Sequence, residues 1–292
     1  MKRILITGGN GQVGRELAQV CWPQAIECVM PGRMDLDLSD AENVKAFVLA
    51  GNFDAVINPA AYTAVDQAET DAIAAFKVNA LAPAAFADAT RELGIPLVHV
   101  STDYVFDGSK VGAYVEDDPI RPLNLYGASK AAGEHAVRLG NPRHVILRTA
   151  WVFSSHGSNF VKTMLRLANR PQLGIVDDQR GCPTAARDIA SALATITLRL
   201  IEDAGAPTGT YHFVSEDPVT WYGFAQEIFR YEALHGRSAP LLQAIETRDY
   251  PTPARRPRNS VLSIERLMRD YDIRPGSWKT GLQATLEALT VR

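Results

Sequence analysis

The chain has 292 residues, of which 46% are hydrophobic and 22% are charged, with a formal net charge of -3. This length suits one large α/β unit or a core domain with a smaller lobe, and the composition is that of a globular protein. With 30 basic and 33 acidic residues, the chain has no broad electrostatic reason to bind nucleic acid, and we expect no such partner.

The cysteines and the first residues of the chain indicate in which cellular compartment the protein is expected. Cys21, Cys28 and Cys182 form no C-x-x-C pair, so we expect neither a disulfide framework nor a zinc site. The apolar run at residues 4–6 ends at Thr7 and is too short for a signal peptide. No stretch approaches the roughly 18 apolar residues of a membrane span. We therefore expect a cytoplasmic protein without a membrane partner.

The first half of the chain alternates short apolar runs with helical stretches. Strands are predicted at residues 4–7, 28–30, 55–58, 97–101 and 145–149, and helices at 14–21, 41–50, 70–93 and 126–139. Asp40 with Asn43 favours a helix start, and Gly94 favours a helix end. This alternation predicts an α/β fold with a doubly wound, Rossmann-like parallel sheet.

The regular alternation of predicted strands and helices ends at about residue 150. Loops rich in Gly, Pro, Asn and Arg are expected at 154–159, 177–184 and 250–260. We therefore divide the chain into a domain at 1–150 and a smaller C-terminal lobe at 151–292. Some segments of the lobe are expected to return to the core, and a cleft is expected between the two parts.

A glycine turn follows the first predicted strand and opens a helix. Its spacing, Gly8, Gly11 and Gly14, reads G-x-x-G-x-x-G. Glycine is needed where such a turn is tight and where backbone approaches a pyrophosphate, and the helix start attracts phosphate. We therefore predict that domain 1–150 binds a dinucleotide, with Gly8, Gly11, Gln12 and Val13 contacting it.

The second predicted strand indicates which nicotinamide cofactor is used. NAD enzymes usually carry an acid about 20 residues beyond the turn, where this chain reads Met-Pro-Gly-Arg and ends in Arg33. A guanidinium fits a 2′-phosphate, which favours NADPH. Asp35 and Asp37 lie close by and leave NADH open. Asp37 and Leu38 are candidates for flanking the adenine.

The third predicted strand ends in small residues. Ala60, Ala61 and Tyr62 follow it directly. Small side chains at the carboxyl end of a parallel strand let a ligand lie against the backbone, and doubly wound sheets bind ligands at this edge. We therefore expect these three residues to contact the cofactor.

A catalytic set is predicted from Thr102, Tyr126 and Lys130. On a helix, Tyr126 and Lys130 share one face, and an ammonium near a phenol lowers its pKa so that the proton can be transferred. Lys130 can also hold cofactor ribose hydroxyls. Thr102 ends the fourth predicted strand at the ligand-facing edge, where its hydroxyl can donate to a carbonyl oxygen that Tyr126 protonates.

At this point the chain resembles the extended short-chain dehydrogenase/reductase family, and within it the nucleotide-sugar reductases. The resemblance runs through nearly the whole chain. The diagnostic stretches are STDYVFDG at 101–108 and YPTPARRPRNS at 250–260, and further matches lie at 8–14, 58–66, 126–130, 148–151, 159–165 and 178–184.

The resemblance implies hydride transfer from NADPH, or alternatively NADH, to the 4-keto carbon of a dTDP-linked 6-deoxyhexulose. The product would be dTDP-L-rhamnose, for polysaccharide biosynthesis. Tyr126 would deliver the proton, and Lys130 would lower its pKa and hold the ribose. The resemblance further implies that the sugar nucleotide contacts Thr102, Asp103, Trp151 and Arg255, although the neighbouring Arg256 is an alternative to Arg255.

Several other functions are compatible with parts of this sequence. Tyr104 stands where related dehydratases carry a Glu, which disfavours elimination. A reductase or epimerase for another nucleotide sugar, and a non-catalytic regulatory subunit on the same fold, stay open. Some similar reductases hold magnesium at a homodimer contact. Glu16 matches that site, but Arg187 would repel the metal, so we expect no metal ion and leave the homodimer open.

Overall fold

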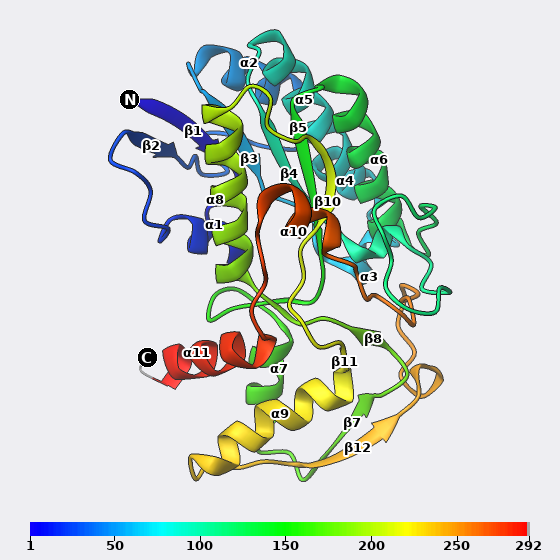
Figure 1. Ribbon diagram of the computed structural model, residues 1–292. Helices are drawn as coiled ribbons and strands as arrows, with labels where there is room; N and C mark the ends of the chain where they lie inside the picture. Colours follow the sequence, from blue (N-terminus) through cyan, green and yellow to red (C-terminus); the bar gives the residue numbers. More distant parts are fainter. Residues whose placement is uncertain (291–292) are drawn as a thin grey trace.

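A six-stranded sheet forms the centre of the chain in the computed structural model, which describes residues 1–290 (Figure 1). The strand order is β10-β5-β4-β3-β1-β2, and every neighbouring pair is parallel. The strands are β1 (Lys2–Ile6), β2 (Ile26–Val29), β3 (Ala55–Asn58), β4 (Leu97–Thr102), β5 (His144–Thr149) and β10 (Gly209–His212). The predicted doubly wound parallel sheet is confirmed.

The order of the strands reverses between β1 and β3. In β1, Ile4 pairs with Cys28 of β2 on one side and with Ala55 of β3 on the other. Ligands of open α/β sheets bind beyond the carboxyl ends of the strands at such a reversal. The glycine turn leaves β1 there and the small residues leave β3 there, so the sheet brings these two segments together.

Both faces of the sheet are buried, because alternate strand residues point to opposite sides. Ile4 and Ile6 pack with α1 (Gln12–Leu17) and α8 (Ala186–Glu202), and α8 crosses the near face in Figure 1. Leu5 packs with the helices of the other face. These are α2 (Ala41–Ala50), α5 (Ala82–Glu92) and α6 (Leu125–Gly140).

The helices begin where side chains can cap them. Asp40 accepts a hydrogen bond from the backbone N–H of Asn43 at 3.1 Å and starts α2, as predicted. Asn124 caps α6 through the N–H of Gly127 at 2.8 Å. The helix predicted at 14–21 is shifted: α1 starts at Gln12 and ends at Leu17, because tighter backbone bonds such as Gln19 N–H to Glu16 C=O close its last turn.

The helix predicted at 70–93 is α4 (Ala72–Phe76), a π-helix η1 (Lys77–Leu81) and α5 in sequence. Contrary to the sequence prediction about membrane spans, Ala72–Glu92 is long and apolar enough to cross a membrane by length and composition. Half of its apolar window is buried inside the protein. Its Ala82, Phe86 and Ala89 belong to the core between α2, α6 and the sheet, which is the packing of a core helix.

A second lobe lies beyond the carboxyl ends of the strands (Figure 1). Its core packs α7 (Phe160–Leu167), α9 (Trp221–Leu234) and α11 (Trp278–Thr290) on the pair β7 (Gln172–Val176) and β12 (Leu241–Ile245). Short pairs join it to the sheet: β6 (Val152–Phe153) with β9 (Thr184–Ala185), and β8 (Arg180–Gly181) with β11 (Val219–Thr220). Between these segments the chain returns to the sheet as α8 and β10.

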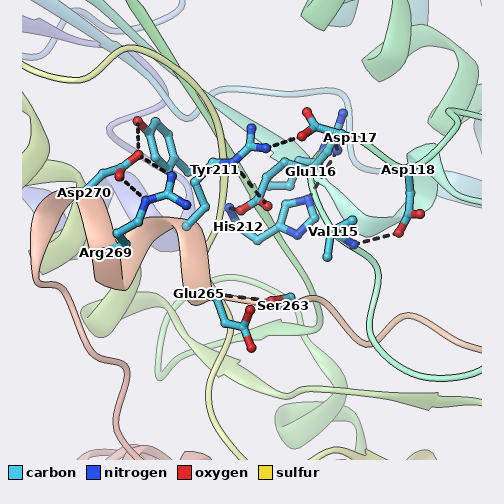
Figure 2. Close-up of polar contacts among 12 residues, drawn as sticks. Val115, Glu116, Asp117, Asp118, Tyr211, His212, Ser263, Glu265, Arg269 and Asp270 are labelled. Atoms are coloured by element: carbon cyan, nitrogen blue, oxygen red, sulfur yellow. Dashed lines mark hydrogen bonds and ion pairs between the residues drawn. The ribbon is translucent and has the colours of Figure 1, made fainter.

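The edge strand β10 is covered by α10 (Glu265–Tyr271) and by the loop at residues 115–118, as Figure 2 shows. The backbone N–H of His212 donates to Glu116 at 3.2 Å, and the Tyr211 hydroxyl donates to Asp270 at 3.1 Å. Arg269 pairs with the same Asp270 at 2.7 Å. An open edge strand can pair with other chains, and these contacts protect it.

Candidate active site

Two adjoining cavities open at the carboxyl edge of the sheet. The first, about 620 Å³, reaches from the glycine turn to the second lobe and is lined by Thr102, Tyr126 and Lys130. Asp103, Trp151, Gln12 and Val13 also line it. The second, about 570 Å³, holds Arg33, Asp37, Leu38 and Tyr62. Gly8, Gly11, Ala60 and Ala61 line both. The cavities thus bring together every predicted site residue except Arg255.

The glycine turn has a geometry that other residues would disrupt. Gly8 has a φ of +63°, and a Cβ placed on it would lie 3.0 Å from the Cα of Ala60. At Gly14 a Cβ would lie 2.1 Å from the carbonyl oxygen of Gly8. Backbone therefore forms the floor shared by both cavities, and this bare surface fits the pyrophosphate of a dinucleotide.

The second cavity has the polarity expected for an adenosine phosphate. Hydrogen bonds from Ser39, together with the charges of Arg33 and Lys77, lower the pKa of Asp37 below its usual value. Arg33 is exposed, so its guanidinium is accessible to a 2′-phosphate. Lys77 and Ser39 also line this cavity and were missed by sequence reasoning, because no glycine or strand end marks them.

Lys130 lies almost wholly inside the protein, with 2% of its surface exposed. Its ammonium donates to the carbonyl oxygen of Val100 at 2.7 Å and lies 3.4 Å from Nε2 of His99. Burial lowers the pKa of Lys130 to about 8, while the nearby Glu134 carboxylate opposes the change. A positive charge is therefore retained at neutral pH but is lost readily above it.

Tyr126 differs from the sequence expectation in its acidity. Burial raises its pKa to about 12, a hydrogen bond with Thr102 lowers it, and the Asp103 charge raises it. The expected lowering by Lys130 is not found, because the ammonium is directed to Val100 and His99. The phenol is therefore protonated at neutral pH, which is the state that a proton donor needs.

Thr102 and Asp103 form one polar unit at the end of β4. The Thr102 hydroxyl donates to Oδ1 of Asp103 at 2.9 Å and accepts from the N–H of Tyr104 at 3.2 Å. Within residues 1–290, Oδ2 of Asp103 is buried without a hydrogen-bond partner. Burial raises the Asp103 pKa to about 6. Hydrogen bonding to Ser260 and Thr102 opposes this rise.

Trp151 is held between two neighbours. Its ring stacks on Trp221 with centroids 3.4 Å apart and an interplanar angle of 7°. A Cβ placed on Gly181 would lie 2.6 Å from the Trp151 ring, so glycine is required there. Trp151 has a φ of +47°, a left-handed conformation that costs energy for a bulky residue. Trp221 also lines the first cavity, and no sequence pattern indicated it.

Arg255 and Arg256 make different contacts in the structure. Arg256 binds Asp66 at 2.8 Å. The Arg255 side chain is exposed and makes no hydrogen bond within residues 1–290, while its backbone carbonyl accepts from Asn124 at 2.8 Å. Neither arginine lines the two cavities. The structure therefore does not bring Arg255 into contact with the other predicted site residues.

A separate hollow holds the residues considered for magnesium. Glu16, His156 and Arg187 line it, and His156 Nε2 lies 3.7 Å from a Glu16 oxygen. In the described part of the chain, no group of three or more His, Cys, Asp or Glu residues is arranged to hold a metal ion. The absence of a metal stays a prediction.

Comparison with known proteins identifies the family. The family model described as the RmlD substrate binding domain matches residues 1–291. The dTDP-4-dehydrorhamnose reductase of Aggregatibacter actinomycetemcomitans is 43% identical over 288 residues, which cover 97% of this chain and 98% of that protein. The chain belongs to the dTDP-4-dehydrorhamnose reductase family.

Other members of the dTDP-4-dehydrorhamnose reductase family agree in sequence and in structure. The enzyme of Burkholderia thailandensis is 46% identical over 287 residues, covering 95% of each chain. A crystal structure of the Bacillus anthracis enzyme in complex with NADP matches with a TM-score of 0.90 and 33% identity, covering 99% of this chain and all of the other. The resemblance drawn from the sequence motifs is confirmed.

Proposed function

We propose that this chain uses NADPH to reduce the 4-keto group of dTDP-4-dehydro-6-deoxy-L-mannose, giving dTDP-L-rhamnose. The observation that carries the proposal is the meeting of Thr102, Tyr126 and Lys130 in one cavity that continues into the glycine turn. Family membership supplies the substrate, since the relatives are named for this reduction. NADH is the alternative cofactor, and Arg33 favours NADPH.

Different residues of the chain have different roles in the proposed reduction. NADPH, when bound, supplies the hydride to the 4-keto carbon. The Thr102 hydroxyl donates to Asp103 in the structure, and by turning its one hydrogen to the keto oxygen it would polarise the carbonyl. Tyr126 transfers its phenolic proton to the same oxygen as negative charge develops there. The Lys130 ammonium would hold the ribose hydroxyls. To stabilise the phenolate that remains, it would have to turn from Val100 and His99 toward Tyr126.

Cofactor and substrate approach the catalytic residues from opposite sides. Gly8, Gly11 and Ala60 would hold the dinucleotide, and Arg33 would bind its 2′-phosphate. Residues 1–150 form its binding domain, while 151–292 mainly hold the sugar nucleotide. Asp103 accepts a sugar hydroxyl and Trp151 borders the hexose with its ring edge. Arg255 is proposed for the diphosphate, because Arg256 is paired with Asp66.

We propose that the enzyme works in the cytoplasm. All three cysteines are free thiols, which agrees with a reducing compartment. The homodimer stays a prediction that sedimentation at several protein concentrations would test.

The test is an assay of NADPH oxidation with and without dTDP-4-dehydrorhamnose, followed by NMR of the product. Stoichiometric oxidation and a rhamnose product support the proposal. No turnover in a protein that binds NADPH would overturn it. Conversion of a nucleotide sugar without net cofactor consumption would instead indicate an epimerase. A protein that binds NADPH but converts no nucleotide sugar would be a regulatory subunit.

A further inference from the structure

Three buried polar side chains connect the cofactor turn with Lys130. Thr7 follows β1, while Asn58 ends β3 and is the register partner of His99 in β4. Thr7 Oγ lies 2.6 Å from Oδ1 of Asn58, and Nδ2 of Asn58 lies 3.1 Å from Nδ1 of His99. His99 Nε2 lies 3.4 Å from the ammonium of Lys130. Asn58 and His99 are fully buried, so these contacts replace water completely.

The ring of His99 is neutral in this position. Burial and then the positive charge of Lys130 hold the pKa of His99 well below its ordinary value. A neutral imidazole has one nitrogen that donates and one that accepts. Its tautomer therefore decides what His99 presents to Lys130.

The two tautomers correspond to two charge states of Lys130. A charged ammonium only donates, so it needs Nε2 of His99 as an acceptor; the ring proton is then on Nδ1, and Asn58 must turn its amide oxygen toward it. The Thr7 hydroxyl, 2.6 Å from the Asn58 amide, can donate to its oxygen or accept from its nitrogen, so Asn58 can present either atom to Nδ1 of His99. When the amide nitrogen faces Nδ1, the ring proton is on Nε2, and only a neutral lysine amine can accept it.

The other ionisable groups near Lys130 do not replace this contact. The ionisable groups on α6 itself are Tyr126, Glu134, His135 and Arg138, and Arg138 pairs with Glu134. Those on neighbouring elements are Asp103 and Tyr104 on η2 (Asp103–Val105), Arg148 on β5 and Glu69 at the end of α3 (Val65–Ala68). Glu134 is bound by Arg148 at 2.8 Å, and Glu69 accepts from the N–H of Leu125 at 2.8 Å. Within residues 1–290, the hydrogen-bond partners of the Lys130 ammonium are Val100 and His99.

We propose that His99, oriented by Asn58, is a positioning residue that holds the Lys130 ammonium in the cleft and determines how easily it loses its proton. This inference rests on the proposed reductase function, in which Lys130 must be charged beside Tyr126. Removal of the His99 acceptor leaves a buried ammonium with one fewer partner, which favours the neutral amine.

The first experiment compares the pH dependence of kcat in three variants. His99→Leu removes the acceptor, His99→Gln restores one at a similar reach, and His235→Leu is a control at an exposed histidine. We expect the fall of kcat at high pH to move about one pH unit lower in His99→Leu and to stay near the wild-type position in the other two. A loss of kcat by the same factor at every pH in His99→Leu would reduce His99 to a structural residue.

The second experiment does not need turnover. In full-length protein labelled with ¹⁵N-histidine, the two ring nitrogens of His99 are assigned by their absence in His99→Gln. We expect the proton on Nδ1 at neutral pH and on Nε2 in Lys130→Met or at a pH above the lysine pKa. If the ring proton stays on the same nitrogen both in Lys130→Met and at a pH above the lysine pKa, the inference is overturned. If the protein shows no turnover but the His99 tautomer still changes as expected, the result contradicts only the reductase function.

Discussion

Asn159 of the second lobe donates a hydrogen bond to the side-chain oxygen of Gln12, 2.8 Å away, at the start of α1 directly after the glycine turn. The Ser154 hydroxyl donates to the same oxygen at 3.1 Å. The loop that carries them also brings Gly157 and Ser158 to the wall of the first cavity. Gln12 therefore links the cofactor turn to the lobe that we propose binds the sugar.

Replacing Gln12 with Ala should weaken both binding events. Two hydrogen bonds at about 1 kcal/mol each are lost, so the Kd for NADPH and the KM for the sugar should each rise about tenfold. Fluorescence titration and steady-state kinetics measure these values. Gln283→Ala is the control, since that exposed side chain donates to Glu287 one turn further along α11. A change in the NADPH Kd alone would show that the lobes are not coupled through Gln12.

Tyr126→Phe should lower kcat by roughly 10²–10⁴-fold, which is the usual contribution of a positioned proton donor. The NADPH Kd should change little, because the phenol ring is retained. Stopped-flow single turnovers would separate the chemical step from product release. Tyr231→Phe, in the second lobe, is the matched control. Near-wild-type kcat in Tyr126→Phe would assign the proton to another group.

Arg33→Ala should decrease selectivity for NADPH. A charged hydrogen bond contributes about 1.5–3 kcal/mol, so the Kd for NADPH should rise about 10- to 100-fold while that for NADH stays nearly constant. Calorimetric titration with both cofactors measures the difference. Lys45→Ala removes a cation on α2 that lines neither cavity and controls for net charge. Equal weakening for both cofactors would indicate that Arg33 does not contact the 2′-phosphate.

Glu134→Gln should strongly destabilise the fold. Glu134 and Arg148 are both wholly buried and 2.8 Å apart, so the variant leaves the arginine charge without its partner. Breaking such a pair costs about 3–5 kcal/mol of unfolding free energy, which urea denaturation measures. Glu227→Gln, in the exposed pair with Arg230, should cost less than about 1 kcal/mol. Similar losses in the two variants would refute this explanation.

The pH profile of the wild-type enzyme should decline on the alkaline side. Burial lowers the pKa of Lys130 to about 8, so the positive charge proposed to hold the cofactor ribose in the cavity is lost as pH rises through that value. On the acid side, Asp103 has a raised pKa of about 6 and takes up a proton below it. Activity should therefore be greatest between these values, and Asp103→Asn should remove the acid limb. Thermal melts at each pH would exclude unfolding as the cause.

The sequence predicted strands that match β1 to β5, but it did not predict β10 at the edge of the sheet, and it supplied the motifs from which the site is proposed. Alternating apolar runs predicted the strands, because parallel strands buried on both faces leave a local pattern. The glycine turn and the Tyr126–Lys130 spacing are also local, so they are visible without coordinates. The early end of α1 and the π-helix at Lys77–Leu81 were missed, since they depend on backbone hydrogen bonds that composition does not show.

Only the tertiary structure decided the electrostatics of the site. The sequence predicted a low pKa for Tyr126 from its distance to Lys130 along one helix. Folding instead buries the phenol and directs the ammonium toward Val100 and His99 of β4, which raises the phenol pKa. Lys77, Trp221 and His99 likewise join the site from segments far apart in the chain. Desolvation and hydrogen-bond partners come from such long-range packing, whereas strand, turn and helix signals are local.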